Sequence, residues 1–136
     1  MKTITVPAKI DNLEEVTNFV DCFLEENDCS LKAQTQIDVV IDEIFHNIVS
    51  YAYQQDGGDV TIQIENTESC RIVLTFKDMG VPFDPLKSED PDITLDAQQR
   101  EIGGLGIYMV KKMMDNVSYE YCDGQNILVL EKNLAG

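Results

Sequence analysis

The chain has little of what several common classes of protein need. It has no tryptophan and a single histidine, and 10 lysines and arginines stand against 25 aspartates and glutamates in 136 residues. The formal charge of −15 repels polyanions, so we expect neither nucleic acid nor an anionic membrane among its partners. A nucleotide can still bind an acidic protein where Mg²⁺ and backbone N–H groups offset its charge. The composition therefore predicts a need for divalent metal.

The cysteines and the hydrophobic runs exclude further classes. No C-x-x-C pair occurs, which argues against a zinc site and against thioredoxin-like chemistry. No apolar stretch approaches membrane-spanning length, and the first residues lack the apolar run of a signal peptide. We therefore expect a reduced, cytoplasmic protein in which the cysteines are small buried hydrophobes. These cysteines are Cys22, Cys29, Cys70 and Cys122.

The hydrophobic periodicity predicts one domain over residues 1–136, with an α+β fold. Strands are expected at 2–6, 60–64, 71–76, 117–122 and 126–132, and helices at 11–26, 31–53 and 107–114. Asp11 is expected to cap the first helix and Ser30 the second. This order of elements predicts a two-layer sandwich, with helices on one face of a mostly antiparallel sheet.

The helix expected at 31–53 carries a polar pair at the edge of an apolar face. Glu43 and Asn47 are four residues apart, so they lie on neighbouring turns, just off the apolar stripe. An acid and an amide so placed can hold a proton acceptor and a metal-binding carbonyl on a rigid element. A solvated border is the alternative. The apolar stripe consists of Ile37, Ile41, Ile44, Ile48 and Tyr51, widened by Val40, Phe45 and Ala52.

Glycines occur at two further places that could bind a ligand. Gly103, Gly104 and Gly106 open a helix, where free N–H groups and the helix dipole suit a phosphate, although they could merely shape a turn. The P-loop and dinucleotide-binding patterns are absent. Asp78, at the end of a strand and two residues before Gly80, is either a turn residue or a carboxylate that accepts from an amino group such as that of adenine.

A long segment separates these glycines, at about residues 81–102. It contains three of the four prolines, many charges and little periodicity. Unstructured loops of this length are uncommon in compact domains unless they act as lids or binding loops. We therefore expect this segment to be a lid.

Taken together, these motifs resemble a known family. Their order and spacing resemble the asparagine box and the two glycine boxes of the GHKL ATPase superfamily, and within it the chain is most similar to anti-sigma-factor serine/threonine protein kinases. The resemblance covers nearly the whole chain and implies a Bergerat-type sandwich with ATP between the helices and the lid. The three motifs are Glu43-x-x-x-Asn47, Asp78-x-Gly80-x-x-Phe83-Asp84-Pro85 and Gly103-Gly104-Leu105-Gly106-Ile107-Tyr108.

The resemblance also implies a role for each matching residue. Glu43 corresponds to the general base, Asn47 to the Mg²⁺ ligand and Asp78 to the carboxylate that reads adenine. The ATP-binding residues implied beside these are Gly80 and Phe83 in the first glycine box, and Gly103, Gly104, Leu105 and Gly106 in the second.

The chain departs from the family pattern in two places. Many members carry a basic residue shortly after the asparagine, but Ser50 and Tyr51 stand there in this chain. Arg100 and Lys111 are candidates to neutralise the phosphates instead, with solvated surface residues as the alternative. Val81-Pro82 stands where some relatives have a second glycine.

The function implied by the resemblance is a protein kinase. Such a protein uses Mg²⁺ and ATP to phosphorylate a serine or threonine on a small antagonist protein, in partner-switching control of a sigma factor, and a homodimer is also implied. Two other functions fit the same motifs. One is a non-catalytic module that binds a partner only with nucleotide, and the other is a plain ATPase in which Glu43 orients water.

Overall fold

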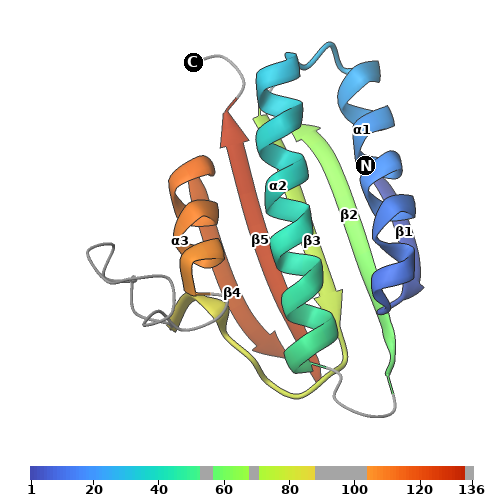
Figure 1. Cartoon of the computed structure of the whole chain (residues 1–136), viewed down its shortest axis with the longest axis vertical. Helices are drawn as coiled ribbons and strands as arrows, with labels where there is room; N and C mark the ends of the chain where they lie inside the picture. Colours follow the sequence, from blue (N-terminus) through green and yellow to red (C-terminus); the bar gives the residue numbers. More distant parts are fainter. Residues whose placement is uncertain (53–56, 68–70, 88–103, 134–136) are drawn as a thin grey trace.

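The computed structural model describes residues 1–52, 57–67, 71–87 and 104–133. Within these residues, one five-stranded antiparallel sheet is covered on one face by helices (Figure 1). No helix in these ranges is long and apolar enough to cross a membrane. The predicted α+β sandwich is thus confirmed. The helices are α1 (Leu13–Glu26), α2 (Leu31–Asn47) and α3 (Gly104–Met113), and the strands are β1 (Lys2–Pro7), β2 (Asp59–Thr67), β3 (Arg71–Asp78), β4 (Asn116–Cys122) and β5 (Gln125–Asn133).

The sheet is built from two hairpins whose inner strands pair with each other. The strand order is β1-β2-β3-β5-β4, so β3 is central and β1 lies at an edge, as predicted. The second hairpin turns through Asp123 and Gly124, whose φ angles of 54° and 80° suit a two-residue turn that follows the twist of the strands. The pairing of β3 with β5 places Asp78 opposite Asn126.

The core lies between the sheet and the helices. Alternate residues of the strands face the helices because side chains alternate between the two sides of a sheet. The predicted apolar stripe of α2 meets them, and its members through Ile48 are buried. The side chains of Tyr51 and Ala52 lie outside the described part. The fully buried residues of this layer include Ile37, Val40, Ile41 and Phe45 of α2, Ile62 and Ile64 of β2, Ile72 and Leu74 of β3, and Leu130 of β5.

Three helix ends test the predicted caps and bounds. The Ser30 side chain accepts a hydrogen bond from the N–H of Ala33 at 3.1 Å, which confirms the cap of α2. The predicted Asp11 cap is wrong, because a 3₁₀ turn over Ile10–Asn12 precedes α1 and satisfies the Leu13 N–H through the carbonyl of Ile10. The regular part of the second helix also ends earlier than predicted, and a π-helical turn follows over Ile48–Ala52.

The prediction that the cysteines are buried is wrong for two of them. Cys22 is exposed because it lies on the opposite side of α1 from the buried Val20 and Leu24. Cys122 is exposed at the end of the edge strand β4. Cys29 is partly exposed, and Cys70 lies outside the described residues.

Two acidic side chains meet where α1 packs against α2. Oδ1 of Asp21 and Oδ1 of Asp38 are both buried, and no hydrogen-bond donor in the described part reaches either atom. Burial, followed by the hydrogen bond and the charge of Asp21, raises the pKa of Asp38 to about 7. A proton shared between the two carboxyl groups gives both buried oxygens a partner. The pair therefore keeps a proton well above the usual range of aspartate.

Asp38→Asn is expected to flatten the dependence of stability on pH. In the fold, the Asp38 carboxyl holds its proton up to about pH 7, against an ordinary pKa of 3.8. The stability that this raised pKa contributes is complete below the ordinary value and is lost as pH rises through the raised one. Thermal unfolding at several values between about pH 4 and about pH 8 should therefore show a smaller loss of Tm in the variant than in the native chain.

Glu14→Gln is the control, since Glu14 is exposed in the first turn of α1 and its replacement deletes one carboxylate without touching the pair. An identical pH dependence of Tm in the native chain and in Asp38→Asn would contradict the shared proton.

Candidate functional site

Three polar residues are buried in the described part of the chain, and all of them line one pocket. They are Asn47 of α2, Asp78 of β3 and Asn126 of β5, with exposed fractions of 8%, 5% and 4%. The pocket has about 350 Å³ of empty space, part of it open to solvent. Burying a polar group costs free energy unless it is hydrogen-bonded, so three such groups in one pocket mark the candidate site. The rest of the lining is Ile44, Ile48, Phe76, Phe83, Pro85, Tyr119 and Leu128.

The Asp78 carboxylate is held by two donors on the same oxygen. The backbone N–H of Gly80 and Nδ2 of Asn126 each donate to Oδ1, both at 2.9 Å. Burial raises the pKa of Asp78, and these two hydrogen bonds lower it. Because both bonds fall on Oδ1, they leave Oδ2 to accept a hydrogen bond from a ligand. An ionised carboxylate only accepts, so such a ligand must offer an N–H or O–H group.

Asn126 is a site residue that the sequence motifs do not include. Its side chain bonds Asp78, and its Oδ1 accepts from the backbone N–H of Phe83 at 3.1 Å and from the hydroxyl of Tyr119. One signal was available in the sequence. In the alternating pattern of β5, position 126 shares the core face with Leu128 and Leu130, and an amide at a core position calls for partners.

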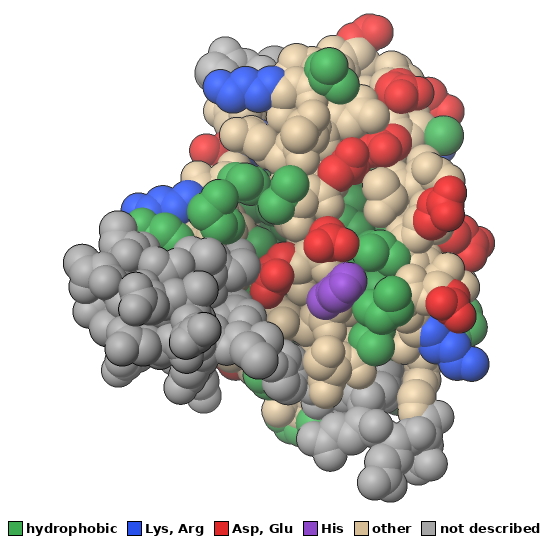
Figure 2. All heavy atoms as spheres, in the orientation of Figure 1, with side chains coloured by type: hydrophobic (Ala, Val, Ile, Leu, Met, Phe, Trp, Pro, Cys, Tyr) green, Lys and Arg blue, Asp and Glu red, His purple; other side chains and the backbone are tan. Residues whose placement is uncertain are grey.

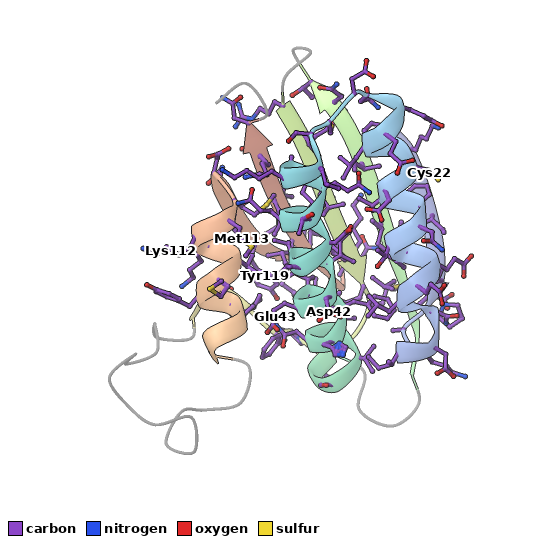
Figure 3. The ribbon with its side chains drawn as sticks, turned by 45° about the horizontal axis from the view of Figure 1, so that its top comes forward. Cys22, Asp42, Glu43, Lys112, Met113 and Tyr119 are labelled. Carbon is purple, nitrogen blue, oxygen red and sulfur yellow. The ribbon has the colours of Figure 1, made fainter. Side chains whose placement is uncertain are left out.

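Glu43 and Asn47 lie on consecutive turns of α2, but only Asn47 lines the pocket. Glu43 is partly exposed and lies on the side of α2 toward α3 (Figure 3). Burial raises the pKa of Glu43, while the charge of His46 and a hydrogen bond with Asn47 lower it. In that bond the amide must donate, because a carboxylate only accepts. The carbonyl oxygen of Asn47 is then available for a cation.

The first glycine box lies at the pocket, and the second is described only in part. Gly80 follows Asp78 in a tight turn, and Phe83 lines the pocket. The first turn of α3, which contains Gly104, Leu105 and Gly106, lies at the same end of the sandwich as the end of α2 and the end of β3 (Figure 1). Gly103 and Arg100 lie outside the described residues. So does most of the predicted lid, from 88 onward, which stays a prediction.

The surface around the helices is acidic. Figure 2 shows acidic side chains spread over the helical face, with basic side chains toward its margins. A polyphosphate approaching from this side meets negative charge. Within the described residues, no group of three or more acidic, histidine or cysteine side chains could hold a metal ion alone. A metal at this site would therefore need ligands from a bound molecule or from water, as Mg²⁺ commonly has. The exposed acidic residues of α1 and α2 include Glu14, Glu15, Glu25, Glu26 and Asp42.

The chain is similar to proteins of one known family. A profile of the histidine kinase-like ATPase domain family matches residues 6–132. The serine-protein kinase RsbW of Bacillus cereus (strain B4264) is 33% identical over 95 residues, which cover 67% of this chain and 59% of the relative. RsbW of Bacillus mycoides (strain KBAB4) is 32% identical over the same length, with the same coverage. The chain thus spans 59% of the length of these curated relatives.

Solved structures share the fold at low sequence identity. The crystal structure of the RsbU and RsbW domains of a Mycobacterium tuberculosis protein has a TM-score of 0.64 at 15% identity, covering 98% of this chain and 33% of that one. SiaB in the SiaB-SiaC complex from Pseudomonas aeruginosa has a TM-score of 0.61 at 16% identity, covering 97% of this chain and 89% of that one. These likenesses concern the fold. Together with the family match, they confirm the resemblance carried by the three motifs.

The contact between Glu43 and Asn47 predicts opposite effects of two substitutions. Asn47→Leu, which roughly keeps the size of the side chain, should raise the pKa of Glu43 because it removes a hydrogen bond that lowers this pKa. Asp42→Asn should lower it, because the negative charge of Asp42 raises it. A pH titration of the glutamate side-chain carboxyl carbons by NMR measures both changes. An unchanged pKa of Glu43 in Asn47→Leu would contradict the contact.

Proposed function

Because the chain belongs to the histidine kinase-like ATPase domain family, we propose that it is a serine/threonine protein kinase of the anti-sigma-factor type. In this proposal it uses ATP to phosphorylate a small antagonist protein. The observation that carries the proposal is the buried carboxylate of Asp78 in the same pocket as Asn47, with Glu43 one turn before Asn47. The name serine-protein kinase, carried by relatives of which the chain spans 59%, supports the same activity.

The shape and chemistry of the pocket suit the base of ATP. Its walls are mostly apolar and include the ring of Phe83, which fits a flat heteroaromatic base. Asp78 offers Oδ2 as an acceptor at the bottom of these walls, and the exocyclic amino group of adenine is a matching donor. The residues of the pocket thus fit adenine in one orientation.

The polar pair of α2 suits the phosphate end. When bound, Mg²⁺ would neutralise phosphate charge, and ATP would supply the phosphoryl group. Asn47 would contribute its carbonyl oxygen to the metal. Glu43 would accept the proton of the attacking serine or threonine hydroxyl. Its pKa is raised by burial, which makes its carboxylate a stronger base than an exposed glutamate.

The partners follow from the same proposal. The acceptor is a serine or threonine hydroxyl on an antagonist protein, and a sigma factor or another regulator is the second partner, with the kinase as a homodimer. A complex between two proteins, SiaB and SiaC, has been solved for a chain that shares this fold. That precedent supports a protein as a binding partner.

Nucleotide binding is expected to depend on Mg²⁺. The net charge of −15 opposes a polyphosphate, and Asn47 is the proposed protein ligand of the metal. Calorimetric titration with ADP should show an affinity at least about tenfold lower in EDTA than with Mg²⁺. Asn47→Ala should reproduce that loss in the presence of Mg²⁺, whereas Asn18→Ala, at an exposed position of α1, should not. Equal affinity with and without the metal would disprove the role of Asn47.

Glu43→Gln is expected to separate binding from transfer. The substitution keeps the size of the side chain but removes the proton acceptor, so phosphate transfer to an added antagonist should fall by at least about a hundredfold. Affinity for Mg·ADP should barely change. Glu25→Gln, the same change at an exposed site of α1, should transfer at the native rate. Three measurements distinguish the possible roles of Glu43. They are the affinity for ADP, the release of ADP without a partner, and the phosphate found on the antagonist.

The other two functions give different patterns in the same assay. A non-catalytic binding module forms no phosphoprotein even with the native chain. A plain ATPase releases ADP at full rate without an antagonist. If Glu43→Gln transfers phosphate at the native rate, Glu43 is a border residue of the helix and the proposed base is wrong.

A further inference from the structure

Asn126 connects three separate segments around the pocket. Its Nδ2 donates to Oδ1 of Asp78 at 2.9 Å and to the carbonyl oxygen of Val81 at 2.8 Å. Its Oδ1 accepts from the backbone N–H of Phe83 at 3.1 Å and from the hydroxyl of Tyr119 on β4. The side chain therefore ties β5 to the end of β3, to the residues that follow β3, and to β4.

Nδ2 of Asn126 also lies 3.5 Å from the carbonyl oxygen of Gly80. The four shorter hydrogen bonds use the whole bonding capacity of the amide. A primary amide has two N–H donors and two acceptor lone pairs. Turning the amide over would bring its oxygen against the carboxylate of Asp78 and the carbonyl of Val81, and its N–H group against the N–H of Phe83. The exposed fraction of Asn126 is 4%, so water cannot readily replace these partners. Asn126 is thus fixed in one orientation and has no atom left to bind a ligand.

We propose that Asn126 is a positioning residue that sets the purine preference of the pocket. The inference rests on the proposed function, because it concerns the base of the nucleotide. By occupying Oδ1 of Asp78, Asn126 leaves Oδ2 as the carboxylate oxygen that faces a base. By holding Val81 and Phe83, it keeps the wall of the pocket against that base.

The geometry separates two classes of purine. A base with an amino group beside Oδ2 gains a hydrogen bond, as adenine does. A base with a carbonyl oxygen there, as in hypoxanthine, brings two acceptors together. Elsewhere an asparagine could turn its N–H group toward that carbonyl, but here the bonds to Phe83 and Tyr119 prevent the turn. Loss of these bonds should therefore weaken the discrimination between adenine and hypoxanthine, and not only the affinity for the nucleotide.

The test compares Mg·ADP with Mg·IDP, which differ at this position of the base. Calorimetry on the native chain should show tighter binding of ADP. Asn126→Asp keeps the shape of the side chain but sets a carboxyl group against Asp78, and such a pair shares a proton. When that proton resides on Oδ2 of Asp78, the carboxyl donates to a purine carbonyl and no longer accepts there from an amino group. The ratio of ADP affinity to IDP affinity should fall by about tenfold or more.

Two further variants sharpen this test. Asn116→Asp is the matched control, because the amide of Asn116 also donates to a carboxylate of the sheet, Glu131 at 3.0 Å, but on the exposed surface. Its affinity ratio should equal the native one. Tyr119→Phe removes only one bond to Oδ1 of Asn126, so the ratio should fall in the same direction by about threefold. This milder variant decides the question if Asn126→Asp does not fold, as judged by circular dichroism.

The outcomes separate the two proposals. If Asn126→Asp or Tyr119→Phe weakens ADP and IDP by the same factor, or changes neither, Asn126 has only a structural role and the inference is overturned. If the native chain binds neither nucleotide, the proposed function fails as well. A native chain that prefers IDP would overturn the orientation of Asp78 while leaving nucleotide binding intact.

Discussion

The pairing of β3 with β5 is the interaction on which the site depends. It places Asp78 opposite Asn126, so that a carboxylate and an amide are buried side by side between an apolar sheet and an apolar helix. Neither group would be tolerated there alone, because an unpaired buried polar group costs more than a hydrogen bond returns. Each satisfies the other on one side and leaves a single acceptor facing the pocket. The acceptor that faces the pocket is thus what remains after the two buried polar side chains have satisfied each other's hydrogen bonds.

The two ends of the pocket differ in what holds them. Asp78 is fixed through a network that links the segment after β3, by the N–H groups of Gly80 and Phe83, to Asn126 on β5 and the Tyr119 hydroxyl on β4. Asn47 and Glu43 depend mainly on the helix that carries them and on each other. A rigid end suits recognition of a flat base, whereas a less constrained end suits groups that must adjust to a metal and an incoming hydroxyl. In the proposed function, the rigid end selects the nucleotide and the other end positions the acceptor.

Elements with strong periodicity could be predicted from the sequence, because burial alone decides them. The stripe through Ile37, Ile41 and Ile44 is an example. The Asp123-Gly124 turn could be predicted for another reason, because both residue types tolerate the positive φ of a two-residue hairpin turn. The failures have a different physical cause. Asp11 has the residue type and spacing of a helix cap, but the 3₁₀ turn before α1 satisfies the Leu13 N–H through the carbonyl of Ile10. Asn126 could be recognised as a polar residue in a core position, but its partners depend on the register between distant strands, which one strand alone does not specify.

The strand order also has a consequence for how the chain folds. β5 is the last strand in sequence within the described residues, yet it lies inside the sheet, between β3 and β4. The pocket draws on residues 47, 78 and 126, so it can form only after β5 has paired with β3. Contacts between residues far apart in the sequence form slowly, because closing the loop between them costs conformational entropy. A ligand that binds the completed pocket therefore stabilises the whole sheet against opening, and not just the loop that it touches.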